Sequence, residues 1–144
     1  MATRRTRLRA FESLSRSVEI RAVKARVSVR PDEPHGVDPI IESNAWLELH
    51  GTADEPMKGT RDIEIHISAA EKVHPGVGPP ACVGAIIQVR PAVSVVVQFP
   101  HLDFDRLWPM ATAGRLTHAR FTVVQPHYGK ARVLSLSVSG AAEE

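Results

Sequence analysis

The segment on which the fold depends is RDIEIHIS, residues 61–68. Ile63, Ile65 and Ile67 alternate here with polar residues at every intervening position. Successive side chains of a β-strand point to opposite sides of the sheet, so a period of two predicts a strand with one buried and one solvated face. The isoleucines are expected to lie in the core.

A second alternating segment, AWLELH at residues 45–50, comes shortly before the first. Alternation places its residues on two faces, Ala45, Leu47 and Leu49 on one and Trp46, Glu48 and His50 on the other. Between the segments lies GTADEPMKG, residues 51–59, which is polar and predicts a loop. We therefore expect two antiparallel neighbours joined by a long loop, with one face buried and one in water.

The composition agrees with a β-rich domain. Val and Ile together number 25 against 9 Leu among the 144 residues, and branching at Cβ suits the pleated surface of a sheet. Hydrophobic residues make up 43% and charged residues 24%, values typical of a globular chain of about one domain. No apolar run is long enough to cross a bilayer, so no membrane partner is expected.

Further strands follow from the same patterns. Period-two alternation begins after Ser17 and changes phase, which predicts a bulge near Ala22–Lys24. Apolar runs separated by Pro91, or flanking the turn 126–129, predict strands over Cys82–Val89, Ala92–Phe99, Arg115–Gln125 and Lys130–Ser139. One short helix is expected over residues 103–114, capped by Asp103 or Asp105 and ended at Gly114.

These elements predict an all-β fold: an antiparallel β-sandwich, or a partly closed barrel, of seven or eight strands. We expect residues 17–140 to form the single domain, preceded by a basic segment or short helix over residues 1–16 and followed by a tail, residues 141–144. A helical turn is possible over Leu8–Leu14, because Leu8, Phe11 and Leu14 would share one face.

Charge is divided unevenly along the chain. Residues 1–30 hold nine basic and two acidic residues, whereas residues 31–144 hold nine basic and fourteen acidic ones. Cys82 is the one cysteine, which excludes an internal disulfide and favours a reducing, cytoplasmic compartment. The Arg- and Ser-containing N-terminus also overlaps in composition with organelle transit peptides, and that alternative stays open.

The sequence contains one repeated constellation of chemically active side chains. Glu48 and His50 share a face of one predicted strand, and Glu64 and His66 share a face of the next. Facing pairs would offer four carboxylate and imidazole groups, a donor set that suits zinc or another divalent ion. Because alternation also puts these residues on the solvated face, ordinary exposure is the favoured interpretation, and no metal or other cofactor is predicted.

Motifs for the common enzyme classes are missing from the sequence. It contains no GxSxG, Walker A, GxGxxG or HExxH pattern. His101, Asp103 and Asp105 alternate in HLDFD, yet helix capping accounts for an aspartate there without catalysis. Enzymatic activity is left uncertain, with a non-enzymatic role favoured and no catalytic residue assigned.

Three functions are consistent with these patterns. The first is a protein-interaction or assembly module, associating with itself or another protein, with Trp46 as an interface residue. The second is nucleic-acid binding through Arg4, Arg5, Arg7 and Arg9, whose charges would neutralise phosphates. The third is a metal-dependent enzyme or a sugar-binding module built on the two Glu-x-His pairs.

Overall fold

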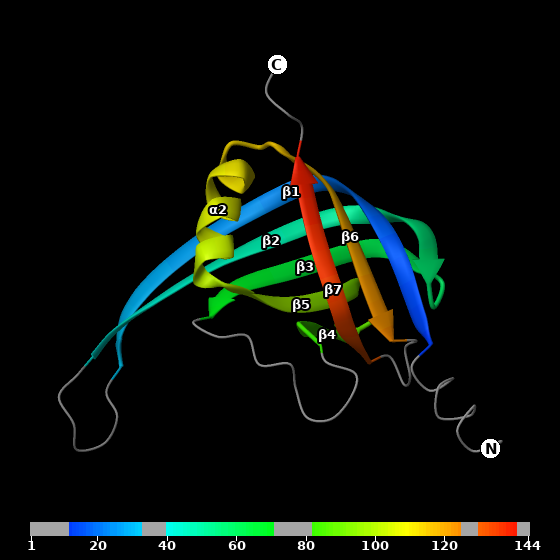
Figure 1. The fold of residues 1–144 in the computed structure, drawn as a ribbon, viewed down its shortest axis with the longest axis horizontal. Helices are drawn as coiled ribbons and strands as arrows, with labels where there is room; N and C mark the ends of the chain where they lie inside the picture. Colours follow the sequence, from blue (N-terminus) through cyan, green and yellow to red (C-terminus); the bar gives the residue numbers. More distant parts are fainter. Residues whose placement is uncertain (1–11, 33–39, 71–81, 125–129, 141–144) are drawn as a thin grey trace.

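The computed structural model describes residues 12–32, 40–70, 82–124 and 130–140. Seven strands and one helix lie in these ranges (Figure 1). They are β1 (Ser13–Asp32), β2 (Ile40–Met57), β3 (Thr60–Ala70), β4 (Gly84–Gln88), β5 (Val93–Pro100), α2 (His101–Thr112), β6 (Leu116–Val124) and β7 (Ala131–Gly140). The predicted all-β class with one short helix is confirmed.

The strands close into a barrel in the order β1-β2-β3-β5-β4-β7-β6, and β6 pairs with β1. Of the two predicted architectures, the barrel is therefore the one that forms. Most neighbouring strands are antiparallel, as predicted, but β3 and β5 pair in parallel. Local alternation says nothing about which distant strands become neighbours, so this parallel pair was not predictable from it.

The barrel interior is filled by the residues that alternation assigns to the buried face. Leu47, Leu49, Ile63, Ile65 and Ile67 are each at most 1% exposed. Antiparallel pairing of β2 with β3 places Leu47 opposite Ile67 and Leu49 opposite Ile65. The predicted neighbour relation of these two strands, with one face buried, is confirmed.

Helix α2 packs on β1, β3 and β5 through Phe104, Leu107 and Ala111, which are buried (Figure 1). It begins at His101, two residues earlier than predicted, after Pro100 at the N-cap. No side chain donates or accepts a capping hydrogen bond at this end, so the predicted cap by Asp103 or Asp105 is wrong.

The prediction of a loop over residues 51–59 is also wrong. Strand β2 continues to Met57, and the chain reverses at Lys58 and Gly59, whose φ angles are 50° and 82°. Positive φ at two successive residues matches the twist of a tight hairpin turn. Gly51 lies inside the strand, where a Cβ would collide with the backbone carbonyl of Glu19, so this glycine marks a close approach of strands rather than a turn.

Strand β1 starts earlier than predicted and joins the barrel at once. Residues Ser13–Glu19 pair with β6, so the last four residues of the predicted N-terminal segment belong to the sheet. Leu14 is therefore in a strand and not in a helical turn, while residues 1–11 lie outside the described part of the chain. The bulge lies at Arg21, one residue before the predicted position.

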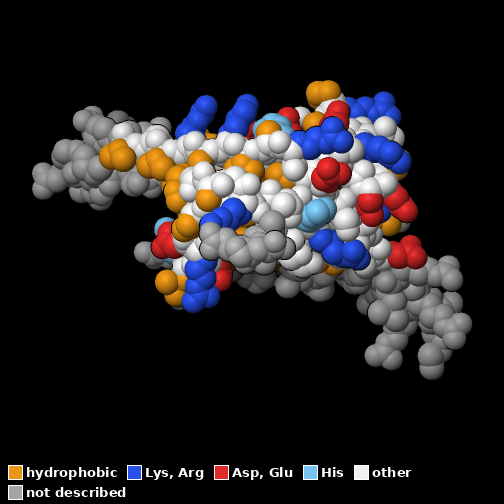
Figure 2. Space-filling model, turned by 90° about the horizontal axis from the view of Figure 1, so that it is seen from above, with side chains coloured by type: hydrophobic (Ala, Val, Ile, Leu, Met, Phe, Trp, Pro, Cys, Tyr) orange, Lys and Arg blue, Asp and Glu red, His pale blue; other side chains and the backbone are white. Residues whose placement is uncertain are grey.

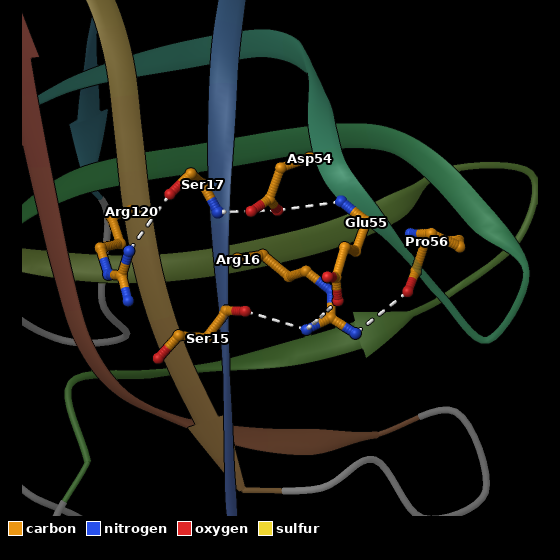
Figure 3. A network of polar contacts seen from close by, with 7 residues as sticks. All are labelled: Ser15, Arg16, Ser17, Asp54, Glu55, Pro56 and Arg120. Carbon is orange, nitrogen blue, oxygen red and sulfur yellow. Dashed lines mark hydrogen bonds and ion pairs between the residues drawn. The ribbon is translucent and has the colours of Figure 1, made fainter.

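Arg16 fixes the end of β2 to the start of β1 (Figure 3). Its guanidinium donates to the carbonyl oxygens of Ser15 at 2.9 Å and of Pro56 at 3.1 Å. Nearby, the backbone N–H of Ser17 donates to Oδ1 of Asp54 at 3.1 Å. These contacts hold the irregular stretch between Thr52 and Met57, where the β2–β3 register shifts, against β1.

Two paired strands leave the barrel together. The β2–β3 ladder ends at Trp46, but β1 and β2 remain paired from Val27 opposite Ala45 to Asp32 opposite Ile40. We call this two-stranded extension, residues 27–32 and 40–45, the projecting hairpin (Figure 1, lower left).

No helix within the described ranges is long and apolar enough to cross a membrane.

Replacing a core isoleucine tests the assignment of faces. Ile65→Ala is expected to lower the free energy of unfolding by about 2–5 kcal/mol, because it leaves a cavity at a fully buried position. Ile87→Ala is the matched control at a side chain that is 53% exposed and should cost well under 1 kcal/mol. Urea unfolding followed by circular dichroism measures both, and equal losses would contradict the assignment.

Candidate functional site

The two Glu-x-His pairs meet on the outer face of the barrel. The β2–β3 register places Glu48 directly opposite His66 and His50 directly opposite Glu64. Directly opposed residues of antiparallel strands have their Cβ atoms about 5 Å apart, close enough for side-chain contact. The structure thus brings together all four residues that the sequence marks as weak metal candidates.

Each imidazole lies between the two carboxylates. Nε2 of His50 donates a hydrogen bond to Oε2 of Glu48 at 3.0 Å, and Nδ1 of His50 lies 3.8 Å from Oε1 of Glu64. Nδ1 of His66 lies 3.4 Å from Oε1 of Glu48, and Nε2 of His66 lies 3.8 Å from Oε2 of Glu64. We call this closed arrangement of four side chains the Glu–His ring.

The ring is partly buried, and its four side chains are between 27% and 36% exposed. The hydrogen bond from His50 lowers the pKa of Glu48 below its ordinary value of 4.5. Partial burial opposes this lowering of the pKa, whereas the charges of His66, His50 and Lys24 reinforce it. Glu48 is therefore the member whose ionised form the ring stabilises.

The chemistry of the ring follows from how its polar atoms are used. Both oxygens of Glu48 and both ring nitrogens of each histidine are directed toward one another. Among the residues that the structure describes, no group of three or more His, Cys, Asp or Glu side chains is arranged to hold a metal ion. In this geometry the ring is a network of polar contacts, two of which cross between the strands and favour one register of β2 on β3.

Hollows flank the ring on either side. One of about 340 Å³ is lined in part by Lys24 and Trp46, and one of about 380 Å³ by Arg21 and Asp62. Each hollow therefore carries at least one basic side chain beside the ring.

Trp46 lies on the outer face next to the ring, as predicted, and is half-buried. The guanidinium carbon of Arg26, on the neighbouring strand β1, lies 5.5 Å from the centre of its ring, a cation–π contact. Trp46 also borders a hollow of about 490 Å³ that separates the base of the projecting hairpin from His101 and Phe104 of α2.

The projecting hairpin exposes apolar side chains on its other face. Val27 and Val29 are 56% and 63% exposed, although their phase along β1 is that of the core. Figure 2 shows hydrophobic side chains at the surface of this part of the molecule, with Lys and Arg side chains standing out along it. The four arginines predicted to bind nucleic acid, Arg4, Arg5, Arg7 and Arg9, lie outside the described residues.

Sequence reasoning missed these exposed valines. Alternation gives Val27 and Val29 the apolar phase of their strand, and in the structure this phase is that of the core. What alternation could not show is that β6 and β3 stop before reaching them. One signal was present: the alternating run after Ser17 extends over more residues than the alternating run of residues 45–50.

Comparison with protein-family models, curated proteins and solved structures found no match. The site is therefore described from its own geometry.

The lowered pKa of Glu48 predicts how stability depends on pH. Ionised Glu48 contributes its stabilisation fully above the unfolded-state pKa near 4.5, and the contribution is lost as the pH falls through the lower pKa of the folded state. Glu48→Gln should therefore lower the free energy of unfolding by about 0.5–1 kcal/mol at pH 6, and by less at pH 3. Chemical denaturation at both pH values measures the difference.

Glu19→Gln provides the matched control for this experiment, because Glu19 is an exposed glutamate of β1 outside the ring. A Glu48→Gln loss at pH 6 that is no larger than the Glu19→Gln loss would show that the ring does not stabilise the fold.

Proposed function

We propose that this chain is a non-enzymatic assembly module of the cytoplasm that associates with a second copy of itself through the projecting hairpin. The observation that carries the proposal is the exposure of Val27 and Val29 on a ribbon that extends beyond the barrel. These side chains follow the phase of the core, yet no strand of the described barrel covers them.

The physical argument begins with the stability of a two-stranded ribbon. An isolated hairpin is marginally stable in water, and a third strand or an apolar surface is needed to hold it. The hairpin nevertheless continues for six residue pairs beyond the last β2–β3 pair. A partner that covers the valine face would supply the missing apolar contact and remove it from water.

The Glu–His ring supports a non-enzymatic role in a different way. Its polar atoms contact one another, and the contacts of His66 with Glu48 and of His50 with Glu64 cross between the strands, so the ring acts in the proposal as a fastening of β2 to β3. This fastening lies next to the position where the hairpin leaves the barrel, and it gives the hairpin a rigid base.

A second copy is the partner that fits best. Its hairpin presents the same apolar face and the same kind of open strand edge, and pairing of identical patches about a two-fold axis closes without leaving a surface free. A different surface of a second copy would form a head-to-tail contact, which gives rings or open fibres rather than a closed dimer. The proposal therefore commits to a closed dimer.

Charge reversal of the apolar face tests this function. The wild-type protein is expected to elute as a dimer at tens of micromolar in size-exclusion chromatography with light scattering. Val27→Glu combined with Val29→Glu should give a monomer, because four carboxylates would meet in the interface. Both positions are more than half exposed, so the variant should fold, which circular dichroism verifies.

Ile87→Glu is the matched control, since Ile87 is 53% exposed on β4, which pairs with β5 and β7 and not with the strands of the hairpin. This variant should remain dimeric. A monomeric wild-type protein, or a dimer that survives the double substitution, would overturn the proposed function.

A further inference from the structure

The hollow of about 490 Å³ at the base of the projecting hairpin has no part in the proposed function. Its walls come from three elements: β2, the end of β3 and the start of α2. The start of α2 lies beside the end of β3 (Figure 1). A hollow of a few hundred cubic ångströms with walls from several elements is of the size that binds a small molecule.

The polar side chains of this hollow are not used by the fold. None of them has a hydrogen-bond or ion-pair partner among the residues that the structure describes: Asn44, Ser68, His101 and Asp105. His101 and Asp105 are four residues apart on α2, so their side chains share one helix face. Between them the four side chains offer both donors and acceptors of hydrogen bonds to a ligand.

Trp46 gives the hollow an aromatic wall. The indole borders this hollow and also the smaller one of about 340 Å³, and Arg26 lines the smaller hollow only. The guanidinium of Arg26 therefore covers the indole from the side of β1, whereas the larger hollow lies toward Ser68 of β3, directly opposite Trp46. The part of the indole that borders the larger hollow is left for a ligand.

The charges around the hollow restrict the class of ligand. No Lys or Arg is among its described lining residues, so a phosphate would meet the carboxylate of Asp105 with no permanent cation to offset it. Asp105 and Asn44 can accept hydrogen bonds from hydroxyl groups, and His101 can donate or accept them. A neutral saccharide fits this lining, because it presents hydroxyl groups around its edge and C–H groups on its face, which packs on an aromatic side chain.

We propose that the hollow binds a neutral saccharide, with one sugar ring against Trp46 and its hydroxyl groups hydrogen-bonded to Asn44, His101 and Asp105. This inference goes beyond the proposed function, because the site uses other residues than the valine face and needs no second copy. One stacked ring and a few exposed hydrogen bonds correspond to a dissociation constant of about 1 mM.

Titration with four neutral disaccharides tests the proposal: maltose, cellobiose, lactose and diacetylchitobiose. Two-dimensional NMR follows the indole N–H signal of Trp46, with that of Trp108 as the internal reference, since Trp108 does not line the hollow. At least one disaccharide should shift the Trp46 signal with a dissociation constant of about 1 mM. If none of the four shifts it at concentrations up to about 20 mM, the proposal is wrong.

The two exposed aspartates of α2 provide a matched pair of variants. Asp105→Ala should weaken binding of that disaccharide about tenfold or more, because it removes a charged hydrogen-bond acceptor from the site. Asp103→Ala is the control, since Asp103 lines a different hollow, and it should leave the dissociation constant within about twofold. Equal effects of the two substitutions would contradict the site.

Substitutions of Trp46 test the aromatic wall. Trp46→Leu should weaken binding about fivefold, whereas Trp46→Phe should retain most of it, because phenylalanine keeps an aromatic face. Circular dichroism verifies that both variants fold. If Trp46→Leu binds as well as Trp46→Phe, the sugar does not stack on this residue.

Choline separates a saccharide site from a cation site. Its quaternary ammonium group would also be attracted by the carboxylate of Asp105 and the indole of Trp46, without using Asn44 or His101. Choline should leave the Trp46 signal unshifted at the concentration at which the disaccharide saturates the site. Binding of choline in place of every disaccharide would overturn the assignment to a saccharide.

Discussion

The register of β2 against β3 determines both the core and the outer site of this protein. Leu47 opposite Ile67 and Leu49 opposite Ile65 fill the barrel, and the residues between them are forced outward. A slip of one residue would turn the isoleucines into water and the Glu-x-His pairs into the core. Burial of the apolar set therefore places the ring, and the cross-strand contacts of the ring in turn disfavour the slipped register.

The match of each glutamate to a histidine follows from strand direction. Both strands read Glu-x-His along the chain, and reversing one of them sets each Glu against a His. Had the two strands been parallel neighbours in register, like would have faced like and the carboxylates would repel. Antiparallel pairing, which the sequence predicted, is thus enough to make the ring complementary once the register is right.

Alternation in the sequence predicted correctly which face of the sheet a residue occupies, but it did not predict how far each strand extends. Alternation is a local property, so it identified the strand over 61–68 and its buried isoleucines. It did not reveal that β2 runs on through Gly51 to Met57, because a glycine in a polar stretch resembles a turn. In the fold this glycine is needed where β1 passes too close for a Cβ. The parallel neighbours β3 and β5 depend on long-range closure of the barrel, which has no local signature.

The same distinction explains the projecting hairpin. Phase along β1 tells which face Val27 belongs to, but exposure depends on where β6 and β3 end, and those ends are set by other parts of the chain. A residue can therefore have the alternation phase of the buried residues and still lie beyond the end of the core, exposed to water. Such residues are recognisable only when the lengths of neighbouring strands are compared.

The two faces of the hairpin base differ in a way that limits how a partner can approach. On the outer face, Arg26 covers part of Trp46, and Lys24 stands next to Glu48, so cations occupy the surface that a second copy would meet. Two such faces would repel one another. On the inner face the described side chains are valine and alanine, which carry no charge to desolvate. In the proposed dimer the valine face is therefore the face that the second copy covers, because its burial removes apolar surface from water without desolvating a charge.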